Sequence, residues 1–438
     1  MKKKLILLLP GLLINMWAIA QSSSTLLRID EAIEIAIEKN FQVVIEKNAR
    51  QTSVINNNWG TAGLWPTINA TAVTGIASNS LEQKLANGTV IKRDGAILRN
   101  VNTGVAVSWR IFDGMRMFAT KKRLEELEQI GELTFRRQIN VTVFEVISSY
   151  YQIVQLKQQK AALLETIRFF EERKKIAEDR FRIGTAPKTD FLQAQVDLNL
   201  QRANLMTVEN NLRIAKSNFN NLLGRTPGVE FDTQEEIEPD ASVSLTSITE
   251  KASAGNYDLL LAQSNLGVLL QQKREILAQR LPTVTLNGNI NYSQNKNDAG
   301  FTLFSRNSGP NGNITLAVPL FNGGNNIRQM KVADITIQNQ RTSIEQIKNQ
   351  VQTSILNAFY NFKNALNLVQ LEKENLELIR ENNLIATERF KKLSITSLEL
   401  RQVQLDYINS QTRYINALFL AKIAETEMKL LAGDLSKL

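Results

Sequence analysis

The sequence predicts a mixed α and β membrane protein that combines four transmembrane β-strands with two long antiparallel helical hairpins in each chain. Three observations predict this fold class. The 438-residue chain matches itself at constant offsets, two stretches of 68 residues lack proline, and four short runs alternate apolar with polar side chains. We expect the hairpins to pack as a coiled-coil α-barrel and the strands to complete a β-barrel with copies of the same chain.

The composition limits the chemistry that the chain can perform. It contains no cysteine and no histidine, which removes thiol nucleophiles, disulfides, imidazole bases and most transition-metal sites. No spaced group of Tyr, Lys and carboxylate side chains indicates a catalytic site, so we expect no enzyme and no cofactor. The formal net charge of +9 falls to +6 without Lys2, Lys3 and Lys4, and this small surplus does not favour nucleic acid as a partner.

The N-terminus has the pattern of an export signal. Residues 1–4 are basic, Leu5–Ile19 is apolar, and Ala18-Ile19-Ala20 is a small-x-small cleavage site. The apolar run is shorter than the ~20 residues of a membrane-spanning helix. We therefore expect residues 1–20 to be a cleaved signal peptide. Since no other apolar run is longer, a mature chain that spans a membrane is expected to do so with strands.

An internal duplication divides the chain. The Phe-Asp-Gly motif at 112–114 recurs as Phe-Asn-Gly at 321–323, and Gly224 recurs as Gly433, both 209 residues later. The Gln-x-Asp motif at 195–197 recurs at the same offset. Constant spacing over this distance indicates rigid elements of matched length. We expect a first structural repeat at 21–224, a connector at 225–244 and a second structural repeat at 245–438.

Each repeat is expected to contain one long helical hairpin, at about 115–223 and about 325–432. Met115–Arg182 and Asn325–Lys392 lack proline, and each would reach about 100 Å as one helix. Apolar residues recur every seven positions in the second repeat, which is typical of coiled-coil packing. These residues are Ile337, Ile344, Val351, Ala358 and Ala365.

Four strands are expected, at about 67–78, 100–111, 283–292 and 313–320. In the third run, for example, Val284, Leu286 and Ile290 alternate with threonine and asparagine. This pattern fits a barrel with lipid outside and water inside, although a half-buried soluble sheet shows the same alternation. The polar segments 79–98 and 293–312 are expected to be long loops.

Four strands in a bilayer leave two unpaired edges, and each unsatisfied backbone group in lipid costs several kcal/mol. Closure by further copies of the chain removes this cost. Three copies would supply twelve strands, an even number within the range of bacterial barrels. A dimer would supply eight strands, which is also an even number, so the strand count alone does not exclude it.

These ordered motifs resemble the TolC family of outer-membrane efflux and secretion proteins. The resemblance rests on the duplicated halves, the motifs at 112–114 and 321–323, and these further motifs: Leu64-Trp65-Pro66, Leu281-Pro282, Arg180-Phe181-Arg182-Ile183-Gly184-Thr185 and Thr189-Asp190. It implies a homotrimer with a twelve-stranded barrel in outer-membrane lipid and a helical tunnel in the periplasm. It also implies a periplasmic adaptor and an inner-membrane pump of the resistance-nodulation-division or ABC type as partners.

The expected function is therefore the passive exit duct of a tripartite efflux or type I secretion system. The alternative is a periplasmic coiled-coil adaptor, or membrane fusion protein, which would carry one hairpin rather than two. Under the resemblance, the turns at the hairpin tips dock the adaptor; they comprise Arg182, Ile183, Gly184, Thr185, Lys392, Leu393, Ser394 and Ile395. Leu393 stands where the family usually has glycine, so we expect the second turn to have a different shape.

The resemblance also implies a gate at the periplasmic entrance. Asp190 and Glu399 lie 209 residues apart and would form a ring of six carboxylates in a trimer, with Thr189 and Gln402 beside them. Acidic rings favour the passage of cations. A carboxylate near the start of a helix is alternatively a partner of the helix dipole.

Overall fold

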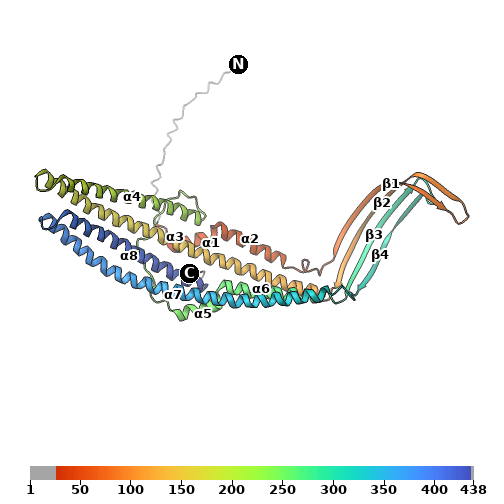
Figure 1. Ribbon diagram of the computed structural model, residues 1–438. Helices are drawn as coiled ribbons and strands as arrows, with labels where there is room; N and C mark the ends of the chain where they lie inside the picture. Colours follow the sequence, from red (N-terminus) through yellow and green to blue (C-terminus); the bar gives the residue numbers. More distant parts are fainter. Residues whose placement is uncertain (1–25, 436–438) are drawn as a thin grey trace, which may run out of the picture.

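The structure, a computed structural model, describes residues 26–435 as an elongated helical body from which a sheet extends at one end (Figure 1). The expected signal peptide at 1–20 lies outside the described residues. Within the described range, no helix has both the length and the apolar character needed to cross a membrane.

Two long hairpins form the body. Helices α3 (Arg116–Arg182) and α4 (Lys188–Leu222) make the first, and α7 (Asn325–Lys391) and α8 (Ser397–Leu431) make the second. The longer helix has 67 residues and the shorter helix has 35 residues in both hairpins. All four bounds of the first hairpin lie 209 residues before their counterparts, so the two hairpins have equal length.

Short helices pack against the hairpins. They are α1 (Ile29–Lys39), α2 (Phe41–Asn56), α5 (Leu245–Gly255) and α6 (Tyr257–Ala278), and α6 among them contacts both α3 and α7. Asn40 caps α2 with its side-chain oxygen, while its Nδ2 donates a hydrogen bond to the Leu222 carbonyl at 2.8 Å. Asn256 caps α6 in the same way and donates to the Leu431 carbonyl at 3.0 Å. One asparagine in each repeat therefore starts a short helix and binds the end of a hairpin.

The hydrophobic core lies at the waist, where α1, α3, α4 and the connector meet. Tyr150 and Phe219 are fully buried there together with Phe231 and Ile237 of the connector. Contacts place the long helices in the order α4, α3, α8, α7, with α6 between α3 and α7. The residues expected to form the heptad seam of α7 are buried or half-buried, and Ala358 is packed in a second cluster.

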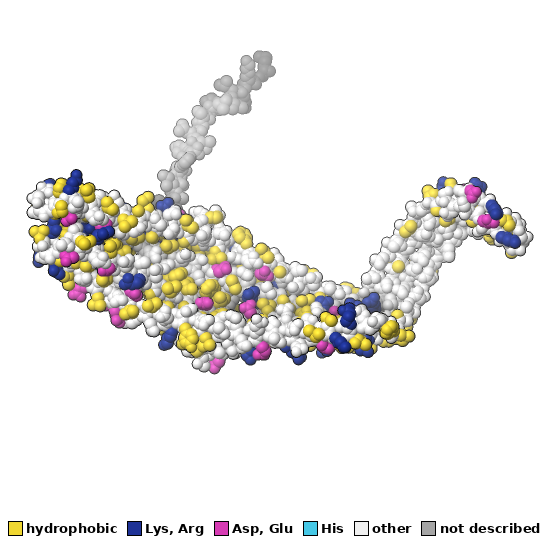
Figure 2. Space-filling view, in the orientation of Figure 1, with side chains coloured by type: hydrophobic (Ala, Val, Ile, Leu, Met, Phe, Trp, Pro, Cys, Tyr) yellow, Lys and Arg dark blue, Asp and Glu magenta, His cyan; other side chains and the backbone are white. Residues whose placement is uncertain are grey.

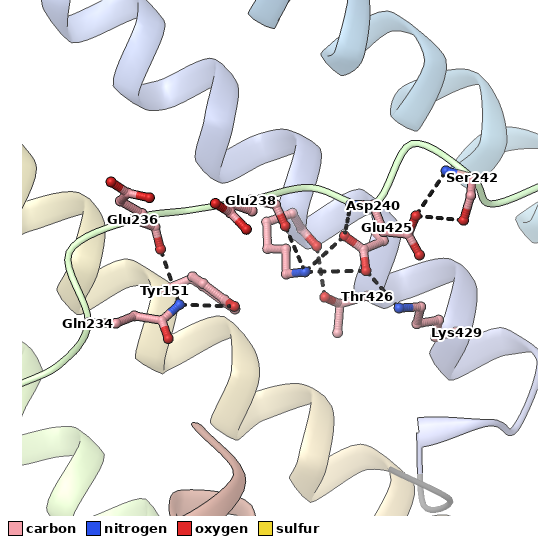
Figure 3. Close-up of polar contacts among 10 residues, drawn as sticks. Tyr151, Gln234, Glu236, Glu238, Asp240, Ser242, Glu425, Thr426 and Lys429 are labelled. Carbon is pink, nitrogen blue, oxygen red and sulfur yellow. Dashed lines mark hydrogen bonds and ion pairs between the residues drawn. The ribbon is translucent and has the colours of Figure 1, made fainter. Parts of the chain in front are cut away.

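The connector crosses from α3 to α8 as an ordered segment (Figure 3). The Gln234 side chain donates to the Tyr151 hydroxyl of α3 at 3.4 Å. Farther along, Glu425 of α8 accepts a hydrogen bond from the Asp240 N–H at 2.9 Å and pairs with Lys429 at 2.7 Å (Figure 3). These bonds fix both hairpins to one segment at the waist.

The sheet contains β1 (Thr67–Lys84), β2 (Val90–Phe112), β3 (Thr283–Asn297) and β4 (Phe304–Ala317), paired antiparallel in that order. The prediction of long loops at 79–98 and 293–312 is wrong. The strands stay paired through most of these segments, and only short connections at 85–89 and 298–303 join them. Backbone pairing needs no apolar alternation, so it extends through the Asn, Ser and Gly residues beyond the alternating part.

The expected strand bounds are corrected accordingly. The strands expected at 67–78 and 283–292 run on to Lys84 and Asn297, and those expected at 100–111 and 313–320 begin earlier, at Val90 and Phe304. The fourth strand also ends at Ala317 rather than at residue 320. Pro319, two residues beyond this end, has no N–H to donate to a ladder, whereas Pro310 remains within β4 because an edge strand tolerates this loss.

The two faces of the sheet differ in chemistry. Register pairs Asn287 with Ser108 and with Asn313, and side-chain hydrogen bonds of 2.9 Å and 3.1 Å connect these three residues across the strands. The opposite face carries large apolar side chains. These include Ile68, Val105, Val107, Trp109, Leu286, Ile290, Ile314 and Leu316, all of them substantially exposed.

Candidate functional site

Both hairpins end at the extremity of the body that lies opposite the sheet (Figure 1). The two tip turns share one backbone pattern. The N–H groups of Gly184 and Thr185 donate to carbonyls three and five residues earlier, and Leu393 and Ser394 do the same in the second turn. Gly184 has φ 76° and Leu393 has φ 61°. The expected difference in shape is therefore wrong, because a leucine adopts the left-handed conformation that glycine adopts in the first turn.

The tip residues are accessible. Arg182, Ile183, Gly184 and Thr185 are exposed, as are Lys392, Leu393 and Ser394, whereas Ile395 is half-buried. Ile183 is 69% exposed and Leu393 is 65% exposed, so an apolar side chain projects from each turn. The tips thus present two similar apolar surfaces to an outside partner.

The proposed gate residues lie just inside the turns, at the start of the returning helices. Asp190 is half-buried in the first turn of α4, and Thr189 beside it is exposed. Glu399 is exposed and accepts hydrogen bonds from the N–H and Oγ1 of Thr396, at 2.7 Å and 3.1 Å. These bonds lower the pKa of Glu399. Glu399 therefore completes a capping box with Thr396, the N-cap residue of α8, which agrees with a role at the helix start.

Within the described residues of one chain, the side-chain hydrogen bonds of the gate residues stay within their own hairpin. Over residues 26–435, no hydrogen bond or ion pair connects Asp190 with Glu399. Gln402 donates to Asp406 at 2.9 Å, farther along α8. Any ring that these side chains form would therefore need other copies of the chain.

A charged cluster that we did not predict from the sequence joins the two hairpins, on the side of the tips that faces the sheet. Asp197 of α4 pairs with Arg173 of α3 at 2.9 Å and with Arg401 of α8 at 3.1 Å. The side chains of Arg173 and Asp197 are 1% and 5% exposed, and Arg401 is 36% exposed. Burial lowers the pKa of Arg173, and the hydrogen bond from Arg173 to Asp197 opposes this shift. One carboxylate therefore serves two guanidinium groups.

Further contacts cross between the hairpins near the tips. The Arg180 guanidinium lies 4.0 Å from the centroid of the Phe390 ring and donates to the Phe390 carbonyl. Lys391 pairs with Glu172 at 2.8 Å. The first hairpin is thereby fastened to the second immediately behind both turns.

Farther from the tips in the same interface, Tyr407 of α8 donates a hydrogen bond to the Glu165 carboxylate of α3 at 3.1 Å. Burial and the neighbouring Glu165 raise the pKa of Tyr407 to about 12, so this hydroxyl remains a donor at physiological pH. The sequence signal for these contacts was weak. Asp197 belongs to the repeated Gln-x-Asp motif, but one of its partners lies on the preceding helix, 24 residues earlier, and the other lies 204 residues later.

Comparison with known proteins identifies the family. The profile of the family described as "Outer membrane efflux protein" matches residues 46–225 and 248–434. The chain belongs to this outer membrane efflux protein family. The match confirms the expectation drawn from the motifs and favours an outer-membrane channel over the periplasmic adaptor. The family is a family of transport proteins, not of enzymes.

Individual relatives agree with this assignment. Protein CyaE of Bordetella pertussis is 22% identical over 358 residues, which cover 80% of this chain and 73% of CyaE. Outer membrane protein TolC of Vibrio cholerae is 28% identical over 202 residues, or 44% of this chain and 43% of TolC. Among solved structures, the outer-membrane channel OprN superposes with a TM-score of 0.76 at 14% identity, covering 93% of this chain and 90% of OprN.

The protein is accordingly an outer-membrane efflux channel of the kind that serves tripartite efflux and secretion systems. Its fold combines helices with an antiparallel sheet, as in other channels of this type.

Proposed function

We propose that three copies of this chain form a continuous exit duct, with a twelve-stranded barrel in the outer membrane and a helical tunnel in the periplasm. Substrates would pass through it without energy input, because the energised step belongs to an inner-membrane pump of the resistance-nodulation-division or ABC type. The observation that carries the proposal is the equal length of the two hairpins. Equal hairpins repeated around a threefold axis give six tips at one level.

The sheet of one chain supports oligomeric closure. Its order is β1-β2-β3-β4, so β1 and β4 each have an unpaired side. Unpaired backbone groups cannot remain in lipid, whereas pairing of β4 with β1 of the next copy removes both edges. The strand lengths of 14 to 23 residues exceed the 9–11 residues that a tilted spanning strand requires.

The helical body supports the same closure. Because the long helices lie in the order α4, α3, α8, α7, helices α4 and α7 form its two edges. Both edges expose large apolar side chains: Leu192, Val196 and Leu200 on α4, and Leu371, Leu378 and Ile385 on α7. The α7 residues recur every seven positions, as in a coiled-coil seam. Packing of α4 against α7 of the next copy would bury both rows.

The tips would dock the helical hairpin of a periplasmic adaptor. Exposed Ile183 and Leu393 offer an apolar contact on each turn, and Arg182 and Lys392 add positive charge beside them. The matched backbone of the two turns supports similar docking at both. Residues 1–20 would direct export and be removed.

Asp190 and Glu399, with Thr189 and Gln402, would line the entrance of the tunnel. Six carboxylates from three copies would favour cations there. The contacts behind the turns, from Arg401 to Asp197 and from Arg180 to Phe390, would hold the hairpins together at rest.

The trimer can be tested with engineered cysteines, because the chain has none of its own. Leu200→Cys on α4 combined with Leu378→Cys on α7, which lie at similar distances from the tips, should give covalent trimers in membranes on treatment with a bifunctional thiol reagent. Thr246→Cys, at an exposed position of α5, combined with Leu378→Cys serves as the control and should remain monomeric. Purified protein should also open discrete channels in planar bilayers. A monomer that opens no channel would overturn the proposal.

A further inference from the structure

Three basic side chains lie on neighbouring strands of the apolar face of the sheet, at the end far from the helices. The strand register places Arg99 of β2 directly opposite Lys296 of β3, and Lys296 opposite Phe304 of β4. Arg306 lies two residues beyond Phe304 on the same face of β4. All three basic side chains are exposed. Residues directly opposite each other in a sheet have Cβ atoms about 5 Å apart, and diagonal neighbours about 7–8 Å.

No carboxylate balances this group. Among residues 26–435, neither Arg99, Lys296 nor Arg306 forms an ion pair. Two nearby carboxylates are engaged with other cations: Glu82 pairs with Lys92 at 2.7 Å, and Asp298 pairs with Arg93 at 3.8 Å. Like charges directly opposite each other destabilise a sheet. An anion from outside the chain would therefore relieve this repulsion.

Aromatic rings hold Arg306 over the group. Its guanidinium carbon lies 5.9 Å from the centroid of the Tyr292 ring and 5.5 Å from that of the Phe304 ring. Stacking on two rings restrains a long side chain before a ligand binds, and the planar fork of donors remains free. Aromatic residues are also enriched at membrane–water interfaces.

The position of the group along the strands fits the edge of a lipid bilayer. From Leu286 to Lys296 the chain advances ten residues, or about 33 Å. At the ~40° tilt of barrel strands this corresponds to roughly 25 Å across the membrane, the height of the apolar band of outer-membrane barrels. Paired strand positions on this face carry no charge between Leu286 and the basic group. Figure 2 likewise shows few charged side chains between the helical junction and the distal end of the sheet.

We propose that Arg99, Lys296 and Arg306 bind the phosphate groups of a diphosphorylated glycolipid in the outer leaflet. The inference rests on the proposed function, because it requires the apolar face of the sheet to contact lipid. Guanidinium groups bind phosphate oxygens in a bidentate manner, and an ammonium adds a point charge. The acyl chains would lie on the apolar band formed by Ile290, Ile314 and their neighbours.

The number of charges selects between two phosphate-bearing lipids. A phosphodiester headgroup such as that of phosphatidylglycerol carries one negative charge, whereas a phosphomonoester carries about −1.5 to −2 at neutral pH. Two phosphomonoesters on one glycolipid therefore match three cations spread over two rows of the sheet. A single phosphodiester would leave two cations uncompensated.

The test uses the full chain in detergent, with three probes: lipid A bearing two phosphates, lipid A bearing one phosphate, and phosphatidylglycerol. Binding is measured by native mass spectrometry for Arg99→Gln, Lys296→Gln, Arg306→Gln and the triple variant. Each substitution should weaken binding of diphosphorylated lipid A about fivefold, and all three about 100-fold, from the free energy of one charge near an anionic surface.

Arg110→Gln is the matched control, since Arg110 is an exposed arginine of the same strand on the opposite, asparagine-bearing face. This variant should bind lipid A as the native chain does. Unchanged binding in the triple variant, or equal loss in Arg110→Gln, would overturn the site. Equal affinity for phosphatidylglycerol and diphosphorylated lipid A would overturn the glycolipid as occupant.

Bilayer conductance and trimer mass of the native chain separate this inference from the proposed function. A native protein that forms trimeric channels, with a triple variant that keeps conductance but loses lipid A, supports both. Trimeric channels whose triple variant binds lipid A normally overturn only the lipid site. A native chain that forms no trimer overturns the proposed function and, with it, the inferred site.

Discussion

The Arg401 guanidinium of α8 lies 3.1 Å from the Asp197 carboxylate of α4, and Asp197 is at the same time 2.9 Å from buried Arg173 of α3. This relationship joins three helices from both hairpins through one carboxylate. Arg401 is partly exposed and Arg173 is buried. Loss of the Asp197–Arg173 pair should therefore cost more folding free energy than loss of the Asp197–Arg401 pair.

Asp197→Asn should lower the free energy of unfolding by about 3–5 kcal/mol, because it leaves the Arg173 charge buried without a partner. Arg401→Gln should cost only about 0–1 kcal/mol, as expected for a pair with a solvated member. Denaturant titration followed by circular dichroism measures both. Equal losses for the two variants would contradict this assignment.

The combined Asp190→Ala and Glu399→Ala variant should reduce cation preference, because it removes six carboxylates from the entrance of a trimer. It should also raise single-channel conductance, because hydrogen bonds of these residues that would hold the entrance shut at rest are lost. Planar-bilayer recordings with a salt gradient measure both quantities. The Glu235→Ala and Glu236→Ala variant removes the same number of charges from the exposed connector and should leave both unchanged. Native conductance in the tip variant would refute the gate.

Leu393→Gly should stabilise the protein by about 1 kcal/mol, since leucine pays a steric cost at φ 61° that glycine does not. Gly184→Leu in the equivalent turn should destabilise it by a similar amount. Thermal unfolding of the two variants and the native chain shows whether each substitution raises or lowers the melting temperature. Destabilisation by Leu393→Gly would show that the leucine side chain contributes more than its backbone costs.

Gly224→Ala should destabilise the protein by roughly 2 kcal/mol. Its Cβ would lie 2.3 Å from the Lys39 carbonyl oxygen, at a residue with φ +66°. Gly228→Ala, four residues later, is the control, because no atom lies within 4 Å of its Cβ position. Denaturation midpoints of the two variants should differ clearly, and equal midpoints would contradict the close approach.

Acid should loosen the start of α8. The pKa of Glu399 is lowered below its ordinary value of 4.5 by hydrogen bonds from Thr396. A carboxyl group with a lowered folded pKa contributes stability above the unfolded value and loses it as pH falls through the folded value. Amide exchange at the first turn of α8 should therefore accelerate, relative to Glu399→Gln, as pH falls below about 4.5. The variant should show no such change, and identical pH profiles would argue against the cap.

The long helices were the part of the fold that sequence reasoning described best. Their bounds follow from proline-free stretches and from the constant offset of 209 residues, because a helix has a fixed rise and tolerates no insertion. Strand ends were described worse. Apolar alternation marks only the part of a strand that contacts an apolar phase, whereas β1 to β4 stay paired beyond it through backbone hydrogen bonds.

The contacts between hairpins could not be predicted, for a different reason. Asp197 and Arg401, which pair across the hairpins, are separated by 204 residues, and each sits in a polar stretch where a charged side chain is common. Leu393 illustrates the opposite error. Its identity indicated a different turn, but the hydrogen bonds of the surrounding helix ends impose the left-handed conformation on it.

The equal helix lengths also restrict how such a chain can evolve. One residue inserted into α3 alone would displace a tip by about 1.5 Å and rotate every following side chain by about 100°. A change in hairpin length that preserves the packing would have to occur in α3, α4, α7 and α8 together. Its size would have to be close to a whole number of heptads. Variation among descendants of this chain should therefore accumulate in the connections at 85–89 and 298–303 and in the connector, while the hairpins are inherited at a fixed length.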